Sequence, residues 1–422
     1  MFSSMMSESG KFLLADAPML VTHILGDCPA CKGKDCFGNV AVYRDYVLRG
    51  CQHCPHELTV WLPEVNKKVL YLDQFFFSGA FRGGEANARF VGAAERVKKA
   101  ARLQLLVAPY SSIHEDETRQ WRGYDGLNHV DLLAFIKNVS HGSEFHQDYH
   151  VEETQVFKAW SAFLKGEPPE YVLERDDAIE GALDEWDSYY RVDVDGYYKD
   201  IELKRSLKAQ SVDELISTFD DWQVSTESFE QDVALEVAET AKIYLNTYIT
   251  KLTRLAHGDY AALGDSPIVS QVVEQMLHWL PKDQPLDLQL RRCVDFFKSE
   301  HFQQVPNLYI SARIYPTLKE MVKRGAYANR KLARKRLNGF FEDVSHISLY
   351  APYCDAFFMD QPMAELVSHP NIDLQGRYGV RVFSLNNLTQ FFEWIDELES
   401  SMSDDHKAGI ETAYPSRNTR VG

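Results

Sequence analysis

The clearest strand signal in the sequence is a short run of apolar residues, Val69–Leu72, with polar residues on both sides. The run ends at Asp73 and is followed by the turn glycines Gly79, Gly83 and Gly84. An apolar run of this length between turn signals is typical of a strand buried on both faces of a parallel sheet. An aspartate that ends such a strand faces the crevice where open α/β sheets bind ligands, although an aspartate there also commonly caps the next helix.

The same kind of pattern recurs after this strand and again near the end of the chain. Apolar residues at helical spacing predict a helix over Glu85–Ala101, and Leu103–Ala108 predicts a second strand. Two late strands are predicted at Ala356–Phe358 and Val380–Leu385, before an amphipathic helix over Leu388–Leu398. Strand, helix and strand in succession begin a doubly wound α/β sheet.

The stretch from about Asp125 to Met321 has helical periodicity in most of its length. The clearest windows are Leu132–Ile136, Val156–Leu164, Val233–Leu255 and Ile268–Leu280. Since this stretch separates the early strands from the late ones, we expect a large helical insertion in the α/β core.

The cysteines are concentrated near the start of the chain, where five of the seven lie between Cys28 and Cys54. Two CxxC pairs stand there with 19 residues between their inner cysteines, and the four residues are Cys28, Cys31, Cys51 and Cys54. This spacing, with strand-like segments between the pairs, predicts a zinc ribbon. Four thiolates leave zinc no open position, so we expect a structural site. Cys36 could substitute for one ligand, and His53 and His56 are weaker candidates.

A net charge of −17 argues against a protein that coats nucleic acid over its whole surface, but it allows a local basic groove. The one dense basic segment predicts phosphate contacts, or alternatively a solvated helix, and its residues are Lys323, Arg324, Arg330, Lys331, Arg334, Lys335 and Arg336. No apolar run reaches 18 residues, so we expect no membrane span or membrane partner. The moderately apolar Lys11–Leu25 lacks a basic leader, which favours a cytoplasmic protein.

Four acidic residues share a place beside predicted strand ends. Asp73 and Asp360 each follow a strand, Asp343 opens a helix, and Glu117 follows the second strand, with Glu115 as its alternative. Parallel strands end at one edge of their sheet, so these carboxylates gather there and repel one another unless cations neutralise them. Hard oxygen ligands select Mg²⁺ or Mn²⁺, which can clamp a phosphodiester and activate a water.

In this order and on these elements the acids resemble those of the PIN-domain nucleases. That family has an Asp ending the first strand, an acid after the second, an Asp opening a late helix and an Asp after the next strand. The first family acid corresponds to Asp73 in the motif YLD, and the second corresponds to Glu117 in the motif PYSSIHEDET. The third family acid corresponds to Asp343 in the motif EDVSHI, and the fourth corresponds to Asp360 in the motif AFFMD. The resemblance covers residues 67–120 and 306–398 and implies a metal-dependent endoribonuclease.

Two features depart from the family pattern. The interval between the second and third acids is long, which places the helical insertion there, and Met359 stands where the family usually has a small hydroxyl residue. Asp355 is an additional acid that either faces the metal or caps the strand. Three further polar residues have open roles: they contact phosphate, they hold the metal ligands in place through hydrogen bonds, or they are turn residues without a function. These residues are Ser78, Ser112 and His114.

The sequence therefore predicts an α/β protein with a PIN-like parallel sheet. We expect a zinc ribbon at 22–66, a core at 67–124 and 306–400, a helical insertion at 125–305 and a flexible tail at 401–422. The expected activity is hydrolysis of RNA, with Asp73, Asp343 and Asp360 on the metal and Glu117 as ligand or water orienter. The alternatives are a non-catalytic RNA-binding or scaffold protein on the same fold, and a DNA-directed nuclease. A regulatory protein partner stays open.

Overall fold

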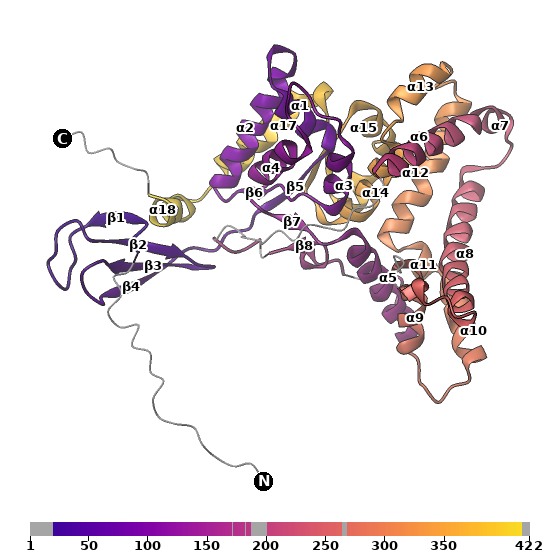
Figure 1. Cartoon of the computed structure of the whole chain (residues 1–422), viewed down its shortest axis with the longest axis horizontal. Coiled ribbons are helices and arrows are strands. Elements are labelled where there is room, and N and C mark those ends of the chain that lie inside the picture. Colours follow the sequence, from indigo (N-terminus) through magenta and orange to yellow (C-terminus); the bar gives the residue numbers. More distant parts are fainter. Residues whose placement is uncertain (1–19, 171, 182, 187–200, 264–267, 416–422) are drawn as a thin grey trace, which may run out of the picture.

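The structure is a computed structural model, and it describes the chain except residues 1–19, 171, 182, 187–200, 264–267 and 416–422. Three parts follow one another across the molecule: a small antiparallel sheet, an α/β core and a helical arm (Figure 1). The mixed α/β fold with a parallel sheet confirms the expected fold class at this coarse level.

The central sheet has four parallel strands in the order β10-β9-β5-β6. They are β5 (Lys68–Leu72), β6 (Leu106–Val107), β9 (Ala356–Phe358) and β10 (Arg381–Phe383). The chain passes from β5 to β6 on one side, and the late strands are added on the other side of β5. The boundary between β5 and β9 is thus the point where the direction of strand addition changes, and open α/β sheets bind ligands at such a point.

Both faces of the sheet are buried, as the unbroken apolar run predicts. Alternate residues of β5 enter two separate cores, Val69 and Tyr71 on one face and Leu70 and Leu72 on the other. The Leu70 face is covered by α1 (Gln74–Arg82), α2 (Ala88–Arg102), α4 (His129–Val139) and α17 (Leu388–Ser400). The Tyr71 face is covered by α12 (Pro306–Lys323), α14 (Phe340–Tyr350), α15 (Gln361–Val367) and α16 (Leu374–Tyr378).

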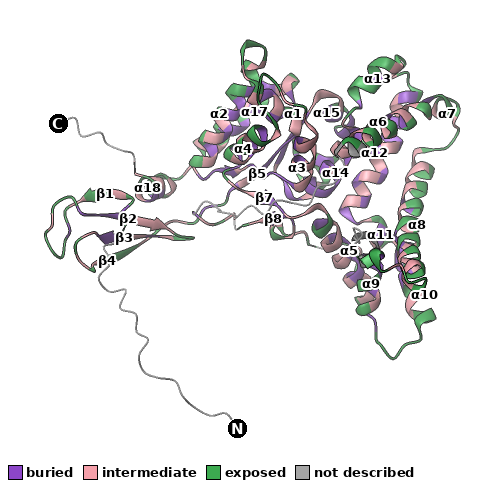
Figure 2. Ribbon diagram, in the orientation of Figure 1, coloured by how far each residue is buried: buried purple, intermediate pink, exposed green. Residues whose placement is uncertain are grey.

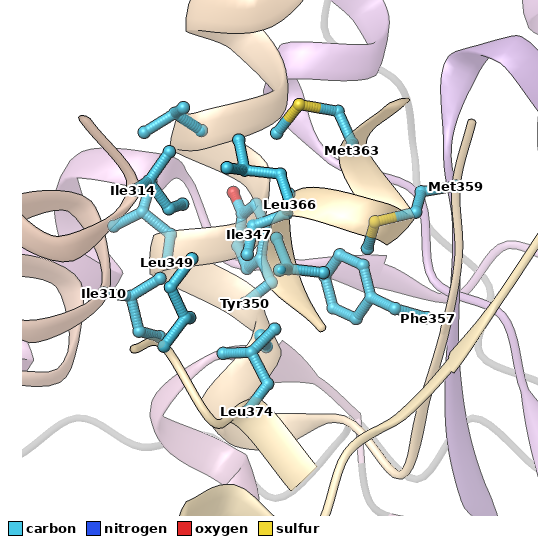
Figure 3. Packing of buried hydrophobic residues seen from close by; sticks show 14 of the residues in the cluster. Ile310, Ile314, Ile347, Leu349, Tyr350, Phe357, Met359, Met363, Leu366 and Leu374 are labelled. Carbon is cyan, nitrogen blue, oxygen red and sulfur yellow. The ribbon is translucent and has the colours of Figure 1, made fainter. Parts of the chain in front are cut away.

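Figure 3 shows the core on the Tyr71 face, where side chains from these four helices and β9 meet. Ile310 of α12, Tyr350 of α14, Phe357 of β9 and Leu374 of α16 are all fully buried there or nearly so. Dispersion and burial of this apolar area fix α16 against α12, although some 50 residues of chain separate the two helices.

The insertion is mostly helical, as predicted; three of the four periodic windows lie within helices, and the fourth, Ile268–Leu280, extends two residues past the end of its helix. Its helices are α5 (Asp148–Lys165), α6 (Ile201–Ser217), α7 (Phe219–Val224), α8 (Phe229–Ala256), α9 (Ile268–His278), α10 (Leu286–Phe297) and α11 (Glu300–Gln303). A two-stranded pair, β7 (Glu144–Phe145) and β8 (Ile179–Glu180), was not expected. The arm has its own core around Trp160, Phe296 and Phe302, and α8 exposes much of its length (Figure 2).

The amino-terminal sheet is antiparallel, with four strands in the order β1-β2-β3-β4. They are β1 (His23–Gly26), β2 (Phe37–Val42), β3 (Tyr46–Cys51) and β4 (Glu57–Trp61). Helix α18 (Asp404–Ala413) contacts this sheet, and the Asn39 side-chain amide donates to the Thr412 carbonyl at 2.8 Å.

The expectation of a flexible tail at 401–422 is therefore wrong for residues 404–413, while residues 416–422 lie outside the described part. Ile410 and Ala413 pack with Val47 and the fully buried Trp186. Val47 and Trp186 are both more than 200 residues away from α18 in the chain. Local periodicity therefore could not reveal these contacts.

Candidate functional site

The four predicted acids all lie at or beside the carboxyl edge of the sheet. Asp73 follows β5 at the N-cap position of α1, and its amide donates to the Phe358 carbonyl at 3.0 Å. Asp360 follows β9 and caps α15, where its carboxylate accepts from the Met363 amide at 2.9 Å. Asp343 is in the first turn of α14, and Glu117 is in α3 (Ser112–Gln120).

The acids lie within electrostatic reach of one another. Burial raises the pKa of Asp73 well above its usual value, and the charges of Glu117 and Asp360 raise it further. Burial also raises the pKa of Asp343, with additional contributions from Asp73, Glu117 and Asp360. The pKa of Asp360 is raised by burial and by Glu365. The fold therefore gathers four carboxylates that cannot all ionise at low cost without a cation.

Glu117 differs from the other three acids because the Lys208 ammonium and the His346 ring face it. Burial, the largest influence, raises its pKa, but His346 and Lys208 together lower it to about 2. The Lys208 ammonium lies 3.2 Å from Glu117 Oε1 and 3.0 Å from Glu342 Oε1, so one lysine bridges two carboxylates. Lys208 belongs to α6, which places a cation from the insertion at the edge of the acid group.

The donor atoms suit a hard cation, although the acids are not packed as tightly as metal ligands. Glu342 Oε2 is buried without a hydrogen-bond partner, whereas Glu117 Oε2 faces His346 Nε2 at 3.6 Å. Carboxylate oxygens are the ligands that Mg²⁺ and Mn²⁺ prefer. In the described part of the chain, the only group of three or more such residues with ligand atoms within 4.8 Å of one another is made of cysteines. An ion held by the acids would require their side chains to draw closer.

A buried layer of rings lies behind the acids and holds β5 in place. The Tyr71 hydroxyl hydrogen-bonds His346 Nδ1, and the His346 ring lies 4.8 Å from that of His114. His114 Nδ1 accepts from the Ser111 amide at 3.0 Å, so its Nε2 carries the proton that it donates to the Leu72 carbonyl at 2.9 Å. Burial, with a smaller contribution from the neighbouring His346, lowers the pKa of His114 to about 3, which keeps it neutral.

These contacts decide among the roles considered for the hydroxyl residues and His114. Both His114 ring nitrogens are occupied by the protein, so this residue supports the acid group from behind and does not contact phosphate. The Ser112 hydroxyl is buried near Tyr350 and is likewise closed to a substrate. Ser78 lies within α1, the helix that Asp73 caps.

Asp355 does not join the other acids, so its assignment as a metal ligand is wrong. It precedes β9 and therefore lies at the amino edge of the sheet, opposite Asp73 and Asp360. Its carboxylate accepts from the Val69 amide at 2.8 Å and is paired with Lys68 at 3.0 Å and Arg175 at 2.8 Å. Three donors satisfy this carboxylate without a metal.

Of the two acids considered after the second strand, Glu117 is the one near the group. Glu115 lies in the first turn of α3 and pairs with Lys137 at 3.6 Å. The sequence pattern did not point to Lys208, Glu342 or His346. Glu342 and His346 flank Asp343 in the motif EDVSHI and could have been found there, whereas nothing local marks Lys208.

The basic segment is split into the end of α12 and a short helix, α13 (Arg330–Arg336). Four of its residues have protein partners: Lys323 with the Glu227 carbonyl, Arg324 with Glu320, Arg330 with Asp220 and Arg334 with Asp213. Lys331, Lys335 and Arg336 are exposed. Because Asp213 is in α6, the basic helix contacts the same helix that carries Lys208.

The amino-terminal cysteines form a candidate zinc site. Cys28, Cys31, Cys51 and Cys54 have sulfur atoms within 4.8 Å of one another, as a tetrahedral thiolate site requires. Cys28 Sγ lies 3.7 Å from Cys54 Sγ, and Cys31 Sγ lies 3.8 Å from Cys51 Sγ. Cys36 Sγ is 3.5 Å from Cys51 Sγ, so the fifth cysteine borders the group.

In the described segments, no helix has the length and apolar character needed to cross a membrane. Comparisons of the chain with protein families, with curated proteins and with solved structures give no significant match. Function must therefore be inferred from the residues and their geometry.

Proposed function

We propose that this protein is a metal-dependent endoribonuclease with a PIN-like core. The observation that carries the proposal is the gathering of Asp73, Glu117, Asp343 and Asp360 at the carboxyl edge of a parallel sheet, beside its switch point. Four separate elements supply these acids, and burial first and the neighbouring carboxylates second raise the pKa values of Asp73 and Asp343. The resemblance of the motifs to PIN-domain nucleases supports the same assignment.

In this proposal Asp73, Asp343 and Asp360 hold Mg²⁺ or Mn²⁺. A divalent cation there neutralises the scissile phosphodiester and lowers the pKa of a bound water. Glu117, whose low pKa keeps it ionised, accepts a hydrogen bond from the attacking water and orients it. His346 and Lys208 hold Glu117 in this ionised state, and the water-excluded ring layer keeps the ligands in place.

The substrate class rests on the family resemblance and on the basic helix. Lys331, Lys335 and Arg336 of α13 are exposed and would contact the phosphate backbone close to Asp343. The zinc ribbon and its structural zinc are part of the same proposal. A cytoplasmic location is also part of it, because all seven cysteines are free and thiols persist in a reducing compartment.

One observation favours the non-catalytic alternative. The Lys208 ammonium already neutralises Glu117 and Glu342, which makes part of the acid group stable without any metal. An RNA-binding or scaffold protein would keep α13 exposed and use Lys208 as a permanent structural ion pair. A DNA-directed nuclease would differ from the main proposal in substrate only.

The test is cleavage of RNA and DNA oligonucleotides of one sequence, with Mg²⁺, Mn²⁺ or chelator. We expect metal-dependent cutting of RNA, loss of at least about 100-fold in Asp73→Asn, and unchanged RNA binding in that variant. Asp396→Asn is the matched control, because Asp396 is exposed on α17 and pairs with Arg96 at 2.7 Å. Full activity in Asp73→Asn contradicts the proposal, and binding without any cutting of either substrate favours the scaffold alternative.

A further inference from the structure

A cavity of about 290 Å³ lies beside the acid group, between α3, α6 and the start of α14. Glu117 of α3, Lys208 of α6 and Glu342 of α14 all line it, so part of its wall belongs to the acid group itself. Sites for drug-sized molecules occupy roughly 300–1,000 Å³. A cavity at the lower limit of this range suits one small planar group.

Three apolar side chains form the other part of the wall: Ile113 of α3, Leu207 of α6 and Phe341 of α14. Ile113 and Phe341 are partly buried against the core, and Leu207 is exposed. Each of the three surrounding helices thus supplies one apolar group. An aromatic ring and aliphatic side chains are the surroundings that proteins provide for an unstacked nucleic-acid base.

The charges of the wall favour a neutral group over a phosphate. Three carboxylates line the cavity, from Asp116, Glu117 and Glu342. Among the described residues of the wall, Lys208 supplies the one ammonium group. This excess of negative charge repels a phosphate, whereas a base carries no net charge. The cavity therefore suits the base of a nucleotide and not its backbone.

The polar groups of the wall act mostly as hydrogen-bond acceptors. The Lys208 ammonium bridges Glu117 and Glu342, which leaves one of its three N–H groups for a ligand. Glu342 Oε2 has no hydrogen-bond partner in the protein. A ligand that completes these groups brings N–H donors to the carboxylate and one acceptor to the lysine.

The other two polar side chains of the wall already donate within the protein. Gln120 Nε2 donates to the Asp116 carbonyl at 3.2 Å, and the Ser211 hydroxyl donates to the Leu207 carbonyl at 3.0 Å. Since the single proton of the Ser211 hydroxyl is used in this way, its oxygen acts toward a ligand as an acceptor. These contacts strengthen the preference for a ligand that is rich in donors.

Guanine is the base whose Watson–Crick edge has this composition. Its N1–H and N2–H₂ groups are neighbouring donors, and its O6 atom beside them is an acceptor. Adenine and cytosine have one donor group on that edge, and uracil has one N–H between two acceptors. A carboxylate can accept from two neighbouring donors of one planar group, as it does from arginine.

We propose that this cavity binds an unpaired guanine of the RNA substrate, next to the phosphodiester that the acids cleave. Glu342 accepts from N1–H and N2–H₂, Lys208 donates to O6, and the base packs against Phe341. The inference rests on the proposed function for its substrate class and adds a base preference. The neighbouring phosphates lie along α13, which Arg334 joins to Asp213 of α6, the helix that carries Lys208.

The test compares four single-stranded RNAs, each a run of uridines with guanosine, inosine, adenosine or uridine at the centre. Binding to full-length Asp73→Asn is measured by fluorescence anisotropy with Mg²⁺, because this variant is expected to bind RNA without cutting it. We expect the guanosine RNA to bind at least about tenfold more tightly than the adenosine and uridine RNAs. Inosine, which lacks the 2-amino group, should lose about threefold or more.

Two further substitutions in the Asp73→Asn protein test the location. Glu342→Gln replaces one acceptor with a donor, so the guanosine and adenosine RNAs should then bind within about twofold of each other. Leu207→Ser removes an apolar wall and should weaken binding of the guanosine RNA by about threefold or more.

The matched controls are Glu397→Gln and Leu235→Ser. Glu397 is exposed on α17 and pairs with Arg381 at 3.3 Å, and Leu235 is exposed on α8. Both should leave the guanosine preference unchanged. Melting curves show which variants are folded, and binding is compared among these.

Equal binding of the guanosine and adenosine RNAs overturns the guanine site, and an unchanged preference in Glu342→Gln overturns its assigned location. Either result, together with metal-dependent cutting by the wild type, leaves the nuclease proposal standing. A guanosine preference without any cutting supports the cavity and favours the RNA-binding alternative. Absence of binding to all four RNAs overturns both proposals.

Discussion

Asp73 and Glu117 belong to one acid group, but their surroundings shift their pKa values in opposite directions. Burial and neighbouring carboxylates raise the pKa of Asp73, whereas His346 and Lys208 hold the pKa of Glu117 at about 2. A pair of carboxylates whose pKa values are separated in this way is typical of sites that divide chemical roles. The residue that needs an external cation is Asp73, and the residue that the protein already neutralises is Glu117.

This difference predicts how stability depends on pH. The folded-state pKa of Asp73 is raised, so the folded form binds its proton more tightly than the unfolded chain does, and stability falls as the pH rises from about 4 toward the folded pKa. Asp73→Asn removes this loss. We expect the gain in melting temperature of Asp73→Asn over the wild type, measured without metal, to grow between pH 4 and pH 8.

A second measurement checks the cause of that gain. Mg²⁺ or Mn²⁺ should raise the melting temperature of the wild type more at pH 8 than at pH 5, since the cation binds the ionised acids. Asp73→Asn should lose most of this metal effect. A lower melting temperature of Asp73→Asn at every pH would instead identify Asp73 as a helix cap.

At the scale of elements, α6 joins the insertion to the acid group. Lys208 is about four-fifths buried and bridges Glu117 and Glu342, while Arg205 donates to the Gln120 carbonyl at 2.8 Å. Asp213 of the same helix pairs with Arg334 of α13. The helix thus links α3, α14 and the basic helix through polar contacts.

Replacing Lys208 with methionine tests this link. Removing one partner leaves two buried carboxylates without a cation, so we expect Lys208→Met to lower the free energy of unfolding at pH 7 by about 1–3 kcal/mol. The same variant should bind Mn²⁺ more tightly, because the acid group has lost its internal cation. In a Glu342→Gln background the cost should shrink, and equal costs in both backgrounds would contradict a shared ion pair.

The exposed side of α13 predicts a salt-dependent effect on RNA binding. Each phosphate contact of a single strand adds about 0.7 to the slope of log affinity against log salt. A Lys331/Lys335/Arg336 triple alanine variant should therefore lower the slope by about 2 units. Lys282→Ala, an exposed lysine of the arm, is the control. An unchanged slope in the triple variant would reject α13 as the phosphate-binding helix.

At the scale of the whole molecule, the two ends of the described chain meet. Helix α18 packs on the amino-terminal sheet, and His406 of α18 hydrogen-bonds the Leu103 carbonyl of the α/β core at 2.8 Å. Trp186, which is fully buried, donates through Nε1 to the Pro63 carbonyl at 2.6 Å. The sheet that carries the cysteines is therefore attached to the core through α18 and the Trp186 segment.

Removal of zinc should loosen this attachment and leave the core folded. A small sheet of this kind depends on its metal for stability, so a strong chelator or Cys28→Ser should raise amide hydrogen exchange in β1 to β4. Because α18 packs on that sheet, exchange should also rise in residues 404–413, while β5 and β9 keep their protection. Metal analysis that finds no zinc in the purified protein would contradict the site.

Local patterns were enough to determine the strand at Val69–Leu72, the clustered cysteine pairs and the helices of the insertion. Each depends on spacing along the chain: an apolar run for a strand with two buried faces, two CxxC turns, and a period near 3.6 for helices. The rule that parallel strands end at one edge also placed Asp73 and Asp360 together, because strand direction follows from the α/β pattern.

Only the tertiary structure decided which charged groups face one another. Asp355 and Asp360 are five residues apart, yet the three-residue strand between them sends one to each edge of the sheet. Lys208 reaches Glu117 from 91 residues away, and Arg313 of α12 and Arg377 of α16 both lie over the Tyr309 ring. Local spacing carries no information on such contacts. They form because apolar side chains distant in the sequence pack together and so bring the helices that carry these charged residues into contact.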